Sequence, residues 1–299
     1  METQVSKTNG YKNIMTNYFF VIPALLMFCI FSLYPFIKVF HLSVFQWDGI
    51  SPSMKFVGLG HFKHIFTANK VWWSSIWHAV YITILALTFQ NALALLLALA
   101  CDKDIKGSKA YRVIFYLPPV LSGIVVGLIW TWIYDGNYGL LNHALEAIGF
   151  GSFSRAWLAD PKTALTSVAI IHMWKGFGWG FIILLAGLQG IPRELYEAAR
   201  IDGATSWQVF KNVTVPFMIP VFFLVSILTI LGTMQIYDVI VATTHGGPGY
   251  HTEVPITRVL SAMTGTSQFG YACAMSIVFG VILLSASFIQ MKISNKAKV

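Results

Sequence analysis

The chain has 299 residues, of which 56% are hydrophobic and 11% are charged, and its formal net charge is +8. Soluble domains carry roughly 25% charged residues, so this composition excludes an ordinary soluble protein and indicates an integral membrane protein. The excess of positive charge can be placed in the loops of such a protein and does not require a nucleic acid partner.

Six apolar runs are long enough to cross a hydrocarbon core of about 30 Å, which takes about 20 helical residues. Backbone groups in lipid must satisfy their own hydrogen bonds, so we expect helices and not the short alternating strands of a barrel. The predicted fold class is all-α integral membrane, with one six-helix domain at 18–291 between tails at 1–17 and 292–299. The six predicted spans are Tyr18–Phe40, Trp77–Ala100, Val113–Tyr134, Ala164–Leu188, Val215–Val241 and Tyr271–Met291.

The first apolar run follows Lys7 and Lys12, an arrangement that a secretory signal peptide also has. The run is too long for a signal peptide, and no small-x-small cleavage pattern follows it. We therefore expect it to remain as an anchor, with Tyr34-Pro35 bending its last turns.

Lys and Arg are distributed unevenly over the polar segments. The two tails and the loops at 101–112 and 189–216 hold twelve of them, and the segments on the opposite side hold seven. The side richer in Lys and Arg stays in the cytoplasm, so both tails and both of these loops are predicted to be cytoplasmic. The external segments are then 41–75, 135–162 and 242–269.

Each external segment has one feature of interest. His61 and His64 in the first could form a ligand pair, although two histidines in a solvated loop explain the spacing more simply. The leucine spacing after Gly139 in the second predicts a short amphipathic helix, lying on the membrane or on a partner. The glycine-rich turn His245–Gly249 in the third either contacts an external partner, shapes an outer gate or is a plain tight turn.

Common sequence motifs of nucleotide-binding, catalytic and metal-binding sites are missing from the sequence. There is no GxxxxGK[ST] phosphate loop, and the nearest fragment, Gly107-Ser108-Lys109, lacks its upstream glycine. No GxSxG, HExxH or paired-carboxylate pattern occurs. The cysteines, Cys29, Cys101 and Cys273, have no metal-binding or disulfide spacing. We therefore predict no catalytic residues, no metal site and no bound cofactor in this chain.

The polar segment at 189–216 has the pattern of two short helices. The first would carry Glu197 near its start and Arg200 near its end, as the helix dipole favours. Gly203 is a natural break, and Thr205 or Ser206 can cap the second helix. The apolar face of the second helix would hold Trp207, Val209 and Phe210.

This segment resembles the EAA motif, E-A-A-x3-G-x9-I-x-L-P, of permease subunits in binding-protein-dependent ABC importers. It reads Glu197-Ala198-Ala199, then Gly203, with Val213 and Val215 in place of the isoleucine and leucine, and then Pro216. The resemblance covers nearly the whole chain and is to the carbohydrate branch, the maltose-type permeases with six core spans. Further matching stretches are Tyr34-Pro35, Trp157–Pro161, Leu185–Pro192 and Asp238 followed by Thr244–Pro248.

The resemblance implies a type I ABC importer permease fold, half of a sugar pathway in a bacterial or archaeal cytoplasmic membrane. It implies as partners a second and different permease, two copies of a cytoplasmic ATPase that binds ATP and Mg, and an external solute-binding protein. The EAA loop (189–216) would dock the ATPase, whereas an amphipathic helix merely lying at the interface would not account for the glycine and the paired alanines. The implied docking residues are Glu197, Ala198, Ala199, Arg200, Asp202 and Gly203.

The resemblance also places the substrate path on the middle of the helix before the loop and the outer half of the helix after it. Aromatic faces and a few polar groups there suit a sugar. Glycines in a span can instead serve helix packing, and aromatic side chains can face lipid. The candidates are Gly176, Phe177, Trp179, Met234, Gln235 and Tyr237.

Lys175 and Asp238 are ionisable groups at membrane depth and should face water, a partner or a ligand. They would pair with each other, or Lys175 would meet a carboxylate of an acidic sugar; we favour the pair. A glycerol-phosphate-type importer would need further cations beside Lys175. A stand-alone ion-coupled transporter would need several carboxylates beside Asp238 and, in many folds, an internal repeat that is not evident here.

Overall fold

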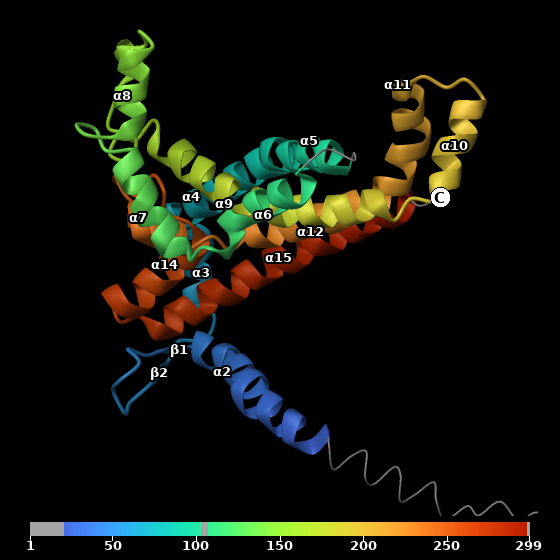
Figure 1. Cartoon of the computed structure of the whole chain (residues 1–299). Helices are drawn as coiled ribbons and strands as arrows, with labels where there is room; N and C mark the ends of the chain where they lie inside the picture. Colours follow the sequence, from blue (N-terminus) through green and yellow to red (C-terminus); the bar gives the residue numbers. More distant parts are fainter. Residues whose placement is uncertain (1–20, 103–106, 298–299) are drawn as a thin grey trace, which may run out of the picture. The chain divides into compact units, whose positions relative to one another are not determined.

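The computed structural model describes residues 21–102 and 107–297, and most of these are helical (Figure 1). Five helical stretches of the described part are long and apolar enough to cross a membrane, and a bent pair of helices provides a sixth crossing if counted as one span. The predicted helical membrane class is thereby confirmed. The predicted tail at 1–17 and the loop lysines Lys103 and Lys106 lie outside the described residues.

The described residues divide into two compact units. The first contains the residues up to Thr67 together with Ala262–Val278. It includes the stretch Val21–Ser43, a two-stranded antiparallel sheet and the start of the last helix. Its elements are η1 (Cys29–Leu33), α2 (Tyr34–Ser43), β1 (Phe45–Gln46), β2 (Lys55–Phe56), α3 (Gly60–Thr67) and most of η5 (Ser261–Gly265).

The second unit contains Ala68–Ser261 and the residues from Phe279 onward. The last helix, α15, therefore supplies residues to both units and runs without a break through Lys292, the predicted start of the tail. The elements are α4 (Lys70–Leu85), η2 (Ala86–Gln90), α5 (Asn91–Asp102), α6 (Ser108–Val120), α7 (Gly123–Ile133), α8 (Leu140–Ala147), η3 (Gly151–Phe153), α9 (Ala164–Gln189), α10 (Arg193–Ile201), α11 (Ser206–Val209), η4 (Phe210–Thr214), α12 (Val215–Met234), α13 (Asp238–Thr243), α14 (Pro255–Leu260) and α15 (Phe269–Ala297).

The third predicted span is not one helix. The structure divides it into α6 and α7, which meet at an angle of 96°. Pro118 and Pro119 occupy the last turn of α6, and Leu121 then adopts an extended conformation. Two consecutive prolines remove two backbone donors, so the helix cannot continue as a straight rod. The prediction of a continuous span at Val113–Tyr134 was therefore wrong.

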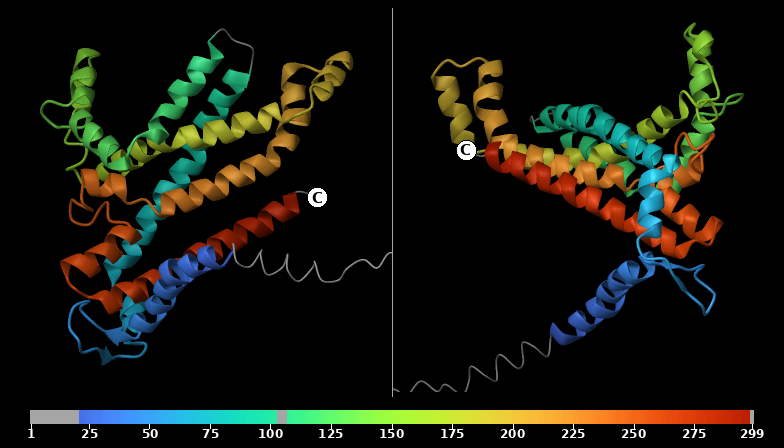
Figure 2. Two further views of the ribbon diagram at one scale, coloured as in Figure 1. Left: turned by 60° about the horizontal axis from the view of Figure 1, so that its bottom comes forward. Right: turned by 180° about the vertical axis from the view of Figure 1, so that it is seen from behind.

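Helix α9 is the centre of the second unit and packs against α5, α6 and α12 (Figure 2). Its glycines allow this close approach: a Cβ on Gly178 would lie 2.5 Å from the backbone oxygen of Phe115 on α6. Two residues further, Gly180 faces Ala94 on α5. Phe181, fully buried, meets the ring of Phe115 edge to face at 5.6 Å between centroids. These residues fix α9 in place, and with it the side chains on its remaining face.

Candidate functional site

The EAA loop folds into two short helices that project from the ends of α9 and α12 (Figure 1). Helix α10 has no buried residue, and Gly203 forms the elbow after it with a φ of +76°. Thr205, one of the two predicted capping residues, caps α11 through a capping box with Gln208. Helix, glycine elbow and helix are thus confirmed as the local structure of this loop.

The inner side of the EAA loop is anchored to the core. Leu195 and Tyr196 on α10 pack against the cluster that contains Leu188 and Met218. The hydroxyl of Tyr196 also lies 3.3 Å from Thr214 Oγ1, which ties the first helix to the second. The outer side, including Glu197, Ala198, Arg200, Asp202 and Gly203, is exposed, and Ala199 is half-buried. The loop thus presents a charged surface on a base that is packed against the core.

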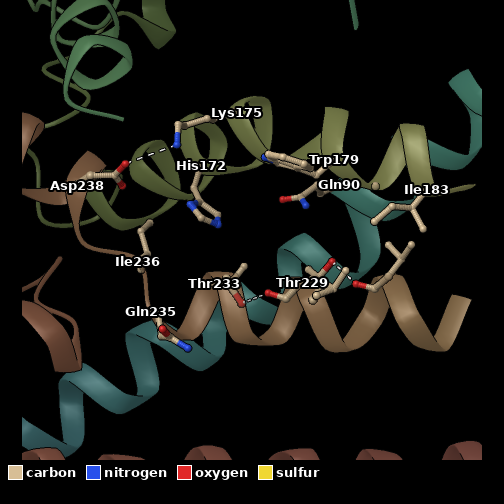
Figure 3. Close-up of a pocket in the computed structure, with 15 residues that line it drawn as sticks. Gln90, His172, Lys175, Trp179, Ile183, Thr229, Thr233, Gln235, Ile236 and Asp238 are labelled. Atoms are coloured by element: carbon tan, nitrogen blue, oxygen red, sulfur yellow. Dashed lines mark hydrogen bonds and ion pairs between the residues drawn. The ribbon is translucent and has the colours of Figure 1, made fainter. Parts of the chain in front are cut away.

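A cavity of about 570 Å³ lies between α9 and α12 in the second unit (Figure 3). This volume is in the range of small-molecule sites. The two helices contribute residues at the i, i+3, i+4 and i+7 positions of one face, as two facing helices should. The lining residues are Gln90, His172, Lys175, Gly176, Trp179, Gly180, Ile183, Val225, Leu228, Thr229, Gly232, Thr233, Gln235, Ile236 and Asp238.

The structure brings only part of the predicted substrate path into this cavity. Gly176, Trp179 and Gln235 line it. Phe177 and Met234 do not, because each lies about one residue away from the lining face of its helix and is buried in the packing instead. Tyr237, in the short link between α12 and α13, is also outside the lining.

Lys175 and Asp238 form an ion pair at the edge of the cavity, with 3.5 Å between Nζ and Oδ2 (Figure 3). The other carboxylate oxygen of Asp238 accepts a hydrogen bond from the backbone N–H of Val239 at 2.9 Å. The carboxylate also lies against Gly123, the first residue of α7, where a side chain would overlap it.

Gln90 is a polar lining residue that was not among the candidates predicted from the sequence. It ends η2 on the second predicted span, outside the two helices named by the resemblance, and only 7% of it is exposed. Its Oε1 atom has no hydrogen-bond partner among the described residues. Gly176 makes room for it, because a Cβ there would lie 2.8 Å from Oε1. Two adjacent amides in an apolar stretch, Gln90 and Asn91, were the available signal.

The histidines of the first external segment lie on a short helix and not in a loop, although His64 is exposed to solvent, as the simpler interpretation held. Both belong to α3, and both ring systems have partners. His61 Nε2 donates to the backbone oxygen of Phe45 at 3.1 Å, and His64 Nδ1 lies 3.1 Å from the hydroxyl of Tyr271. Among the described residues no group of three or more His, Cys, Asp or Glu side chains could hold a metal ion.

The glycine-rich turn after α13 is ordered around one threonine. Thr252 donates from its hydroxyl to the backbone oxygen of Gly247 and lies 2.7 Å from the hydroxyl of Thr244. The next residue, Glu253, is buried, and His78 on α4 donates through Nδ1 to its backbone oxygen at 2.8 Å. The turn is therefore fastened to α4, and burial raises the pKa of the Glu253 carboxyl, with Arg258 opposing the shift.

We expect Glu253→Gln to stabilise the protein at pH 8 and to have little effect at pH 5. A carboxyl with a raised folded-state pKa contributes stability below its unfolded pKa and loses it as the pH rises through the folded value. The amide removes the cost of a buried charge. Thermal unfolding at both pH values measures this, with Glu146→Gln on the exposed face of α8 as the control. An equal fall in melting temperature at both pH values would show that the carboxylate has another role.

Comparisons with known proteins agree with one another. Residues 90–299 match the family described as binding-protein-dependent transport system inner membrane component. The chain is 34% identical to the probable ABC transporter permease protein YurN of Bacillus subtilis, over 96% of this chain and 98% of that protein. It is 29% identical to the trehalose/maltose transport system permease protein MalF of Thermococcus litoralis, over 99% of both.

The fold also has counterparts among solved structures. A chain in the crystal structure of a bacterial ABC transporter involved in the import of the acidic polysaccharide alginate superposes with a TM-score of 0.83. The match covers 96% of this chain and 98% of that chain, at 24% sequence identity. A second structure, the alginate transporter in complex with a pentasaccharide-bound periplasmic protein, also matches with a TM-score of 0.83 at 23% identity.

Proposed function

The chain belongs to the family of inner membrane components of binding-protein-dependent transport systems, and we propose that it is the permease subunit of an ABC sugar importer. It forms half of the translocation pathway and sits as a multi-pass protein in a bacterial or archaeal cytoplasmic membrane. The relatives named for trehalose and maltose, for multiple sugars and for diacetylchitobiose support a sugar as the substrate.

One observation carries the proposal: the exposed EAA loop joins directly the two helices, α9 and α12, that line the cavity. A partner that grips α10 can move both walls of the cavity, because Leu195 and Tyr196 hold α10 on the core. In this assignment Glu197, Ala198, Ala199, Arg200, Asp202 and Gly203 form the contact with the ATPase. Binding and hydrolysis of ATP, with Mg, then shift the balance between inward-open and outward-open states.

The remaining partners and the orientation belong to the same proposal. The EAA loop and both tails face the cytoplasm, as the distribution of lysine and arginine predicts. The assembly contains a second, different permease, two copies of the ATPase and an external solute-binding protein. The turn at His245–Gly249, fastened to α4, then lies on the external side, where it can contact that binding protein or close the gate.

The rival functions find less support in the cavity. A glycerol-phosphate importer needs cations that are free to meet a phosphate, and Lys175 is engaged by Asp238. An ion-coupled transporter needs titratable carboxylates on the path. Asp238 is the only carboxylate among the described residues that line this cavity, and it too is engaged.

Purification from the native membrane tests the proposal. We expect an affinity-tagged chain to bring with it a second permease and an ATPase, and the reconstituted complex to hydrolyse ATP faster when sugar-loaded binding protein is added. Mass spectrometry identifies the subunits, and phosphate release measures the activity. Recovery of a chain that transports in liposomes without any ATPase would refute the assignment.

A further inference from the structure

The cavity described above is electrically balanced. Of its lining residues, Lys175 is the only lysine or arginine and Asp238 the only carboxylate, and the two form an ion pair. Asp238 is held on three sides by Lys175, by the Val239 N–H and by its contact with Gly123. The other titratable lining group is the imidazole of His172, and a free imidazole is mostly neutral at pH 7.5. No unpaired charge is thus offered to an acidic substrate at that pH.

The cavity also contains an unused hydrogen-bonding group. The Gln90 side chain is almost completely buried and faces the cavity beside Trp179, with its Oε1 unpaired among the described residues (Figure 3). Leaving a buried polar atom unpaired costs about 1–3 kcal/mol, so a ligand that pairs it gains affinity. An amide both donates and accepts, and so does a sugar hydroxyl, which makes the match independent of how the amide is turned.

An aromatic surface lies next to this amide. Trp179 is 57% exposed, and its ring meets Tyr116 edge to face at 5.4 Å between centroids. The contact with Tyr116 orients the indole and leaves surface free toward the cavity. Ring faces of sugars carry C–H groups that pack on such an apolar surface, while their hydroxyls need polar groups such as Gln90 at the side.

Building on the proposed function, we infer that the cavity accepts an uncharged saccharide and that Gln90 is a specificity-determining residue. The Lys175–Asp238 pair is then a neutralised structural element of the wall and makes no contact with a substrate carboxylate. In this respect the chain would differ from the transporter of acidic alginate, with which it shares its fold.

The test uses the purified assembly without its solute-binding protein, at pH 7.5 and constant ionic strength. Thermal unfolding is followed with a panel of neutral disaccharides and trisaccharides and with oligouronates of the same lengths, because a ligand that binds the folded state raises the melting temperature. We expect the neutral panel alone to stabilise the wild type. Gln90→Leu should weaken the binding of the neutral sugar that stabilises the wild type roughly tenfold, because one or two hydrogen bonds are lost.

Three further variants complete the test. Asp238→Asn frees the Lys175 ammonium, so we expect this variant to gain stabilisation by oligouronates. Gly176→Ala displaces the Gln90 amide without removing it, so it should also weaken the binding of the neutral sugar. This variant replaces Gln90→Leu in the test if Gln90→Leu folds poorly. Gln268→Leu, at an exposed position before α15, serves as the control for the glutamine exchange.

Three results would overturn the inference. One is stabilisation of the wild type by oligouronates that Lys175→Met abolishes, which would show that Lys175 meets the substrate. Another is unchanged neutral-sugar affinity in both the Gln90→Leu and Gly176→Ala variants. The third is an assembly that retains its ATPase and responds to neither panel, which would leave the permease function in place and remove the saccharide from this cavity.

Discussion

Glu197→Lys is expected to abolish recovery of the ATPase with this permease and to stop transport. Glu197 is exposed on α10 and forms no ion pair with another described residue, so its carboxylate is available to a partner. Reversal of a charge in an interface costs several kcal/mol, which corresponds to about two orders of magnitude or more in affinity. Co-purification and sugar-stimulated ATP hydrolysis measure the effect.

The fold itself should not change in this variant, because the Glu197 side chain is exposed and forms no hydrogen bond or ion pair within the described part of the chain. Its melting temperature is therefore expected to stay at the wild-type value. Glu146→Lys provides the matched control, with the same charge reversal on an exposed helix, α8, at the predicted external side. Loss of the ATPase with Glu146→Lys, or its full retention with Glu197→Lys, would contradict the placement of the docking contact on α10.

Local patterns in the sequence predicted the EAA loop well. A capping residue, a glycine with positive φ and a charged helix act within a few residues of one another, so their structure depends little on the rest of the chain. The structure confirms Thr205 as the cap and Gly203 as the elbow. The membrane-spanning helices were predictable for a similar reason, since length and hydropathy alone decide whether a segment can cross.

The residues that line the cavity could not be predicted from single segments of the sequence. Gln90 reaches the cavity only because η2 passes beside α9 at Gly176, and the amide itself does not predict which helix it will contact. Phe177 and Met234 were selected by residue type, but the rotation of each helix about its axis decides which residues face the cavity. The bend between α6 and α7 escaped a hydropathy-based interpretation because proline and leucine both leave the run apolar.

Gly176 and Gly178 on α9 differ in the kind of neighbour that a new side chain would meet. A Cβ on Gly176 would come within 2.8 Å of the Gln90 amide, the far end of a flexible side chain. A Cβ on Gly178 would meet the Phe115 backbone and Pro119, which cannot move without shifting α6. Exchange to alanine is therefore expected to weaken substrate binding at Gly176 and to destabilise the fold at Gly178.

For Gly176→Ala we expect uptake of the sugar to fall roughly tenfold, because displacement of Gln90 removes about 1–1.5 kcal/mol of hydrogen bonding to the substrate. The melting temperature should change little. Gly178→Ala should lower the melting temperature clearly, since overpacking against a rigid neighbour costs about 1–3 kcal/mol. Gly280→Ala on α15, where a Cβ meets no atom within 4 Å, is the control for both. If Gly176→Ala lowered stability as much as Gly178→Ala and left sugar affinity unchanged, Gly176 would serve helix packing and Gln90 would lose its assigned role.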